Sequence, residues 1–271
     1  MSEFKSILGE FLSEPHSGQE SLYGQKSKEY FFEFAQKFFA SHPSDFQILE
    51  HFGLTERHGE NEAVNYDGVL RHSVTEALLS DTLAEKLGVS ESGRELLVRA
   101  CMLHDSFRRE RGEMYDRYNG GRSAEEELFD PNAHQGREVL RKRGISPEIL
   151  DLMQFMHSSG MFKMDFSNLE EQTESELIQK IFWYIDSSLD NVKLLPLAER
   201  VQRFRDREAG IDQLGYKLTN AKGESLGMSL FDFYIDSGKK FEKFLEQKLE
   251  IQKPNTVIDF LTNLLKQKIQ E

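Results

Sequence analysis

Apolar residues recur along most of the chain at intervals of three and four positions, which places them on one face of an α-helix. Stretches in which apolar and polar residues alternate, as in a half-buried β-strand, are scarce. The pattern therefore predicts an all-α protein. The one turn sequence of the hairpin kind, Asn220 to Gly223, predicts a single small β-hairpin near the C-terminal part of the chain.

The ends of the expected helices are marked by proline, glycine and capping residues. The first apolar stripe runs from Tyr30 to Phe39 and ends before Pro43, because the residue before a proline avoids helical geometry. A second helix is expected between Asp67 and Gly88, and a third from about Glu91 to Asp105. Later helices are expected around residues 134–143, after Ser146, from the capping box of Thr173 and Glu176 to Val192, and over residues 241–248 and 257–265.

Charge and cysteine content narrow the class of protein. With 34 basic and 47 acidic residues the net charge is −13, which disfavours nucleic acid or an anionic membrane as a partner. The N-terminal residues lack the apolar core of a secretory signal, and no segment approaches the ~18 apolar residues of a membrane span. We therefore expect a soluble, cytoplasmic protein. Because Cys101 is the only cysteine, a metal site would have to be built from histidine and carboxylate.

Four of the eight histidines fall near the ends of predicted helices, where the apolar stripes would turn them toward the core. They are separated by 32, 30 and 23 residues, about one helix and one connection each, so a helical bundle can bring them together. Two aspartates share this placement. The six residues are His72, His104, Asp105, His134, His157 and Asp186.

A metal ion would account for this set of residues. Asp186 stands among apolar neighbours, and a carboxylate there is costly unless a cation, a metal or hydrogen-bond donors compensate it. Imidazole and carboxylate suit Fe, Mn, Co, Ni or Zn. Taken singly, each histidine could be a hydrogen-bonded structural residue, and Asp186 could cap a neighbouring helix. Taken together, they favour a site for one or two divalent transition-metal ions.

The order of these residues resembles that of the HD-domain superfamily of metal-dependent phosphohydrolases, which are all-α. His72 comes first, Leu103-His104-Asp105 follows, and Asp186 comes last. The resemblance extends over about Asp67 to Val192. The segments around His134 and His157 are similar to those that carry the additional ligands of dinuclear members, among them bacterial hydrolases of diadenosine tetraphosphate.

The resemblance implies an HD helical bundle over residues 67–192. A helical extension over residues 1–66 would precede it, and a hairpin and helical extension over residues 193–271 would follow and pack on the core. It also implies that His72, His104, Asp105 and Asp186 bind one ion, that His134 and His157 bind a second, and that Asp105 bridges the two. His104 and Asp105 would then be the catalytic residues.

We expect a phosphomonoesterase or phosphodiesterase that acts on a small nucleotide-like substrate by means of metal-activated water. Arg108 and Arg109 are candidates to bind its phosphate through forked hydrogen bonds, the alternative being ion pairs with nearby acids such as Glu110. Asp190, one helical turn beyond Asp186, is a candidate to orient a ligand, and a solvated surface position is the alternative.

Two other functions remain open at this stage. Some HD-domain proteins with similar ligands are mixed-valent di-iron oxygenases, which activate oxygen for C–H cleavage. A non-catalytic HD module would instead bind a ligand or partner through the Phe-rich N-terminal helix or the amphipathic C-terminal helices. The sequence also leaves open the native metal, the substrate, and the choice between a monomer and a homodimer.

Overall fold

The computed structural model describes residues 25–51, 67–106, 138–153, 163–190, 193–207 and 230–270. Within these ranges the regular structure is helical apart from one two-stranded antiparallel pair, which confirms the all-α prediction. Among the helices described, none is both long and apolar enough to cross a membrane. The helices are α2 (Gln25–Ser41), α3 (Pro43–His51), α4 (Asp67–Lys86), α5 (Glu91–Leu103), α9 (Pro147–Met153), α11 (Glu174–Ser188), α12 (Leu197–Arg207), α13 (Leu230–Lys248) and α14 (Val257–Gln270).

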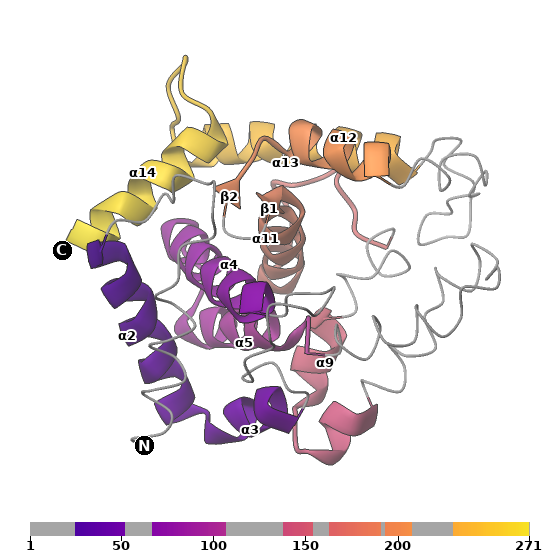
Figure 1. Ribbon diagram of the computed structural model, residues 1–271. Coiled ribbons are helices and arrows are strands. Elements are labelled where there is room, and N and C mark those ends of the chain that lie inside the picture. The colour runs from indigo at the N-terminus through magenta and orange to yellow at the C-terminus, as the bar shows by residue number, and fades with distance from the viewer. Residues whose placement is uncertain are drawn as a thin grey trace.

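Helices α4, α5 and α11 form the centre of the molecule (Figure 1). They pack against one another through apolar stripes of the kind that the sequence pattern predicts. Helix α11 carries three of the largest fully buried side chains, Phe182, Trp183 and Tyr184. Burying an aromatic side chain of this size stabilises a fold by roughly 1.5–3 kcal/mol. The three helices are therefore held rigidly enough to position side chains at their ends.

The remaining helices lie to the left of this centre, above it and below it in the view of Figure 1. Helices α2 and α14, from opposite ends of the chain, contact each other and both pack on α4. Helix α12 packs on α11 and on α13, which lies across the upper end of α11 in Figure 1. Helices α3 and α9 pack on α5. The described parts of the N- and C-terminal regions thus contact the same three central helices.

Most helix ends lie where capping chemistry predicts them. Gly88 and Gly144 have positive φ angles of 76° and 84°, the left-handed backbone that favours glycine after a helix. At the start of α11, the backbone N–H of Glu176 donates to Thr173 Oγ1 at 3.3 Å, and that of Thr173 donates to Glu176 Oε2 at 2.7 Å. This is the expected capping box.

The secondary structure differs from expectation at two places, and one expected element lies outside the described residues. Helix α11 ends at Ser188 and does not continue to Val192, because β1 (Leu189–Asp190) pairs with β2 (Lys193–Leu194). Helix α3, which begins at Pro43, was not expected from the sequence. The hairpin expected at residues 220–223 lies outside the described residues.

A buried ion pair attaches α3 to the central helix α5. Arg99 donates from Nε to Asp45 Oδ2 and from Nη2 to Asp45 Oδ1, both at 2.9 Å. The Asp45 side chain is fully buried, and that of Arg99 is 20% exposed. Two parallel hydrogen bonds between charged groups fix both distance and orientation. The pair thereby holds α3 against the helix that ends at His104.

We predict that Asp45→Ala lowers the free energy of unfolding by about 3 kcal/mol, because it leaves the Arg99 guanidinium without its buried partner. Urea unfolding followed by circular dichroism measures this change. The matched control is Arg141→Ala, which removes a similarly paired but exposed arginine bonded to Glu138 and should have little effect. Equal effects of the two substitutions would contradict a structural role for the Asp45–Arg99 pair.

Candidate metal centre

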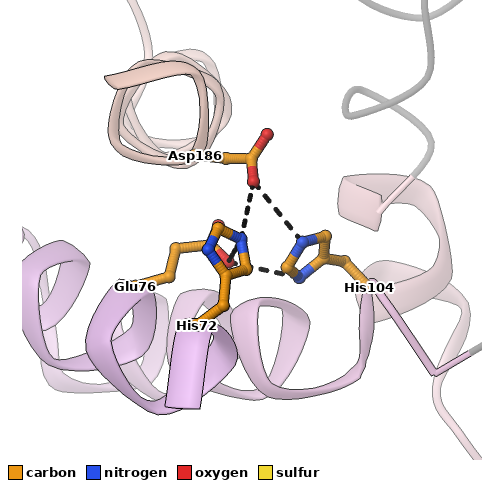
Figure 2. A group of neighbouring side chains, drawn as sticks. All are labelled: His72, Glu76, His104 and Asp186. Atoms are coloured by element: carbon orange, nitrogen blue, oxygen red, sulfur yellow. Dashed lines mark hydrogen bonds and ion pairs between the residues drawn. The ribbon is translucent and has the colours of Figure 1, made fainter. Parts of the chain in front are cut away.

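Four side chains from the three central helices converge on one point (Figure 2). His72 and Glu76 come from α4, His104 directly follows α5, and Asp186 lies in the last turn of α11. One potential ligand atom from each lies within 4.8 Å of those of the other three. Figure 2 shows Asp186 on one side of the group, opposite His72, Glu76 and His104.

The start of α5 and the start of α11 explain why His104 and Asp186 meet. The Glu174 carboxylate accepts hydrogen bonds from the Ser90 hydroxyl at 2.7 Å and from the Ser90 backbone N–H at 2.9 Å. The two helices therefore begin side by side and run in the same direction. His104 comes fourteen residues after Ser90, and Asp186 comes twelve after Glu174. At about 1.5 Å per residue, both side chains reach nearly the same depth.

The two imidazoles face the same oxygen of Asp186. The Nε2 atom of His72 lies 3.0 Å from Asp186 Oδ1, and Nε2 of His104 lies 3.6 Å from it. The other ring nitrogen of His104, Nδ1, donates to the Cys101 carbonyl at 2.8 Å. That bond orients the ring and leaves Nε2 directed at the centre, as is usual for a histidine that binds a metal.

Asp105 lies at the edge of the same group. Its Oδ2 atom is 3.7 Å from His104 Nε2, which faces Asp186 as well. Helix α5 ends at Leu103, so His104 and Asp105 lie in the turn that follows the helix and can point to a common place. The hydroxyl of Ser106 donates to the Leu103 carbonyl at 2.7 Å and stabilises this turn.

Exposure differs across the group and shows where it opens to solvent. The Glu76 side chain is fully buried, and those of His104 and His72 are 6% and 8% exposed. Asp105 is 13% exposed and Asp186 is 29% exposed. The ring of Phe182 covers His104 edge-on, with the ring centroids 5.7 Å apart. A ligand from solvent would therefore reach the centre from the side of Asp105 and Asp186.

Burial and neighbouring charges set the protonation of these groups. Burial opposes a charge on His104, but Glu76, Asp105 and Asp186 outweigh it and raise the pKa of His104 to about 10. Burial also opposes the charge on Asp186, yet hydrogen bonds and charge from His104 and His72 hold its pKa far below the usual value. Burial raises the pKa of Glu76 well above that of an exposed glutamate.

These residues fit a divalent transition metal. Two ligand atoms that each lie ~2.1 Å from one ion are about 3–4 Å apart, and the separations within this group fall in that range. Imidazole and carboxylate are the ligands of such an ion. Both oxygens of Glu76 are buried without a hydrogen-bond partner, a costly state for a carboxyl group that a cation would compensate.

The structure brings together four of the six metal ligands predicted from the sequence, namely His72, His104, Asp105 and Asp186. It adds Glu76, which sequence reasoning missed. Its position could have indicated it, because Glu76 follows His72 by four residues and so lies on the same, apolar face of the helix. The other predicted site residues, His134, His157, Arg108 and Arg109, lie outside the described residues.

The geometry assumed for Asp190 was wrong, because α11 ends two residues before it. Asp190 lies in β1, where Oδ2 is 3.4 Å from Arg203 Nη1 and Oδ1 is 3.8 Å from Arg200 Nε. The proposed role of Asp190 in orienting a ligand remains a prediction.

The C-terminal region also reaches toward the centre. The ring of Tyr234, on α13, packs against Trp183 with centroids 5.8 Å apart. Burial and the charge of Asp186 raise the pKa of the Tyr234 phenol, while Arg200 opposes the shift. Tyr234 follows Asp186 by 48 positions in a separate helix, so local sequence patterns gave no indication of this proximity.

We predict that metal binding releases a proton from His104. In the metal-free protein His104 stays protonated up to about pH 10, whereas a metal binds only the neutral imidazole. Metal affinity should therefore fall about tenfold per pH unit as the pH is lowered from 9 to 7, for each proton released. Calorimetry with Zn²⁺ in buffers of different ionisation enthalpy measures the proton count. A binding enthalpy that is independent of the buffer would contradict this protonation state.

Comparison with known proteins agrees with the geometry. The family model described as HD domain matches residues 69–189, which include all five residues of the centre. No curated protein and no solved structure matches the chain. The matched span coincides closely with the segment of residues 67–192 that resembles the family by its motifs. The residues of the centre thus all lie within residues 69–189, the part of this chain that matches the HD domain model.

Proposed function

We propose that this protein is a metal-dependent phosphohydrolase that cleaves a phosphomonoester or phosphodiester of a nucleotide or nucleotide-like compound. The observation that supports it best is the convergence of His72, His104 and Asp186 within an HD domain. The HD superfamily is one of metal-dependent phosphohydrolases, and the donor set fits the ion that this chemistry requires.

The side chains of the centre have distinct tasks in this proposal. His72 and His104 bind the ion through Nε2, and Asp186 supplies negative charge opposite both imidazoles. When bound, a divalent ion supplies an activated water molecule and neutralises charge on the phosphoryl oxygens. The hydrogen bond from His104 to the Cys101 carbonyl keeps the imidazole in place during the reaction.

Asp105 is placed to take part in proton transfer. It lies at the open side of the centre, with its carboxylate 3.7 Å from His104 Nε2. A carboxylate at this position can accept a hydrogen bond from a water molecule that approaches the phosphorus atom, and can take its proton. Glu76 lies on the closed side and cannot contact an incoming substrate.

The sequence also suggests a second metal ion. His134 and His157 would hold it beside Asp105, and a second ion would supply further positive charge for the phosphoryl oxygens. Arg108 and Arg109, which follow Asp105 directly, would hold the phosphate group of the substrate. The substrate would be a small molecule, since the net charge of −13 disfavours binding of a nucleic acid.

The direct test is a panel of nucleotides and other phosphoesters, assayed with Mn²⁺, Co²⁺, Ni²⁺, Fe²⁺ and Zn²⁺. We expect at least one substrate to release phosphate or a nucleotide, and we expect a chelator to abolish the activity. The same rate should be found with and without oxygen, because hydrolysis consumes only water. A product that forms only in the presence of oxygen would contradict hydrolysis and indicate the oxygenase chemistry.

Substitutions in the centre should remove metal and activity together. His104→Ala and Asp186→Asn each delete a group that binds or balances the ion, so we expect metal content to fall below half and activity to fall by about 10³-fold or more. The control is His42→Ala, which alters a histidine that stacks on Phe38 and pairs with Glu95. Full metal content in both site variants, measured by mass spectrometry of the elements, would contradict the assignment.

A further inference from the structure

Glu76 is the residue of the centre whose presence the sequence motif does not explain. Its carboxyl group lies deep in the core, fully buried, on the same helical face as His72. Both of its oxygens have no hydrogen-bond partner. A buried carboxylate without donors is expensive, and the expense is normally compensated by a cation or a metal. Glu76 therefore needs a positive charge that the surrounding apolar residues cannot supply.

The two histidines cannot fully supply that charge once a metal is bound. Oε2 of Glu76 is 3.2 Å from His104 Nδ1, but the proton on that nitrogen is donated to the Cys101 carbonyl. Oε2 also lies 3.9 Å from His72 Nε2, the nitrogen that faces Asp186. An imidazole binds an ion through Nε2 as a neutral ligand. The ion itself is then the positive charge within reach of Glu76.

We propose that Glu76 is a direct metal ligand, supplied with His72 from one turn of α4. Residues four apart on a helix lie on the same face and can bind one ion together. The separation of 3.9 Å between His72 Nε2 and Glu76 Oε2 suits two ligands that share an ion at ~2.1 Å. Glu76 joins Asp105 and Asp186 as a third carboxyl group of the centre, and this concentration of negative charge favours a divalent cation. This proposal rests on the proposed function only in requiring an ion at the centre.

The test compares metal binding by the wild type, Glu76→Gln and the control Glu85→Gln. Gln has the shape of Glu but no charge. Glu85 lies on the same helix, where it is exposed and pairs with Lys268, so its substitution removes a charge outside the centre. Co²⁺ affinity is measured by competition with a chelator, and the coordination of the ion by its visible absorption spectrum. Circular dichroism of the metal-free proteins checks that the variants fold.

We expect Glu76→Gln to lower Co²⁺ affinity by more than about 100-fold, beyond the 10–100-fold typical of a residue that acts through another ligand. Its Co²⁺ spectrum should change in shape, because one oxygen ligand is lost or replaced. Glu85→Gln should match the wild type in both measurements. An unchanged Co²⁺ spectrum in Glu76→Gln would overturn the proposal, whatever the change in affinity.

A crystal structure of the wild-type protein loaded with Zn²⁺ or Mn²⁺ gives a second measurement that does not depend on the folding of a variant. The proposal requires a Glu76 oxygen about 2.0–2.2 Å from the ion. A distance beyond 3 Å would overturn it. Neither measurement uses phosphate release, so a protein that binds metal through Glu76 but hydrolyses no phosphoester would refute the proposed function and leave this inference intact.

Discussion

A carboxylate buried among apolar side chains is costly unless a cation or hydrogen-bond donors compensate it, and this cost governs the structure of the centre. Asp186 and Glu76 each lie within 4 Å of the same two imidazoles, beside the aromatic core of α11. In the metal-free protein a proton on His104 supplies the positive charge, which is why its pKa is raised to about 10. A divalent ion can take the place of that proton and balance both carboxylates. Metal binding at the centre is therefore coupled to the release of a proton.

The rest of the fold keeps these charges within reach of one another. The bonds between Ser90 and Glu174 align the starts of α5 and α11, and thereby the depth of His104 and Asp186 at their far ends. The bidentate Asp45–Arg99 pair fixes α5 from the other side. Helix α13 places Tyr234 against Trp183, close to Asp186. Elements outside residues 69–189 thus contribute to the surroundings of the centre.

Sequence patterns predicted most of the helices, because the residues at a helix end and next to it determine where the helix begins and stops. The glycine after α4 and the capping box before α11 act through neighbouring residues, and both were found as expected. That His72, His104, Asp105 and Asp186 lie together could be predicted because their order along the chain resembles a known family. Glu76 was missed because a charged residue within an amphipathic helix is usually solvated, and only the packing of α5 and α11 against α4 shows that it is buried. The end of α11 at Ser188 depends on strand pairing, and the Asp45–Arg99 pair joins residues 54 positions apart, so neither follows from local sequence.

We expect histidine nitrogens and carboxylate oxygens of this centre to bind a transition-metal ion. X-ray absorption spectroscopy of the wild-type protein, loaded with one equivalent of Zn²⁺, tests it most directly, because imidazole rings produce a characteristic multiple-scattering signal. The account predicts a shell of nitrogen and oxygen atoms at ~2.0–2.1 Å with at least two imidazoles and no sulfur. A spectrum without imidazole scattering, or one with a sulfur ligand from Cys101, would contradict it.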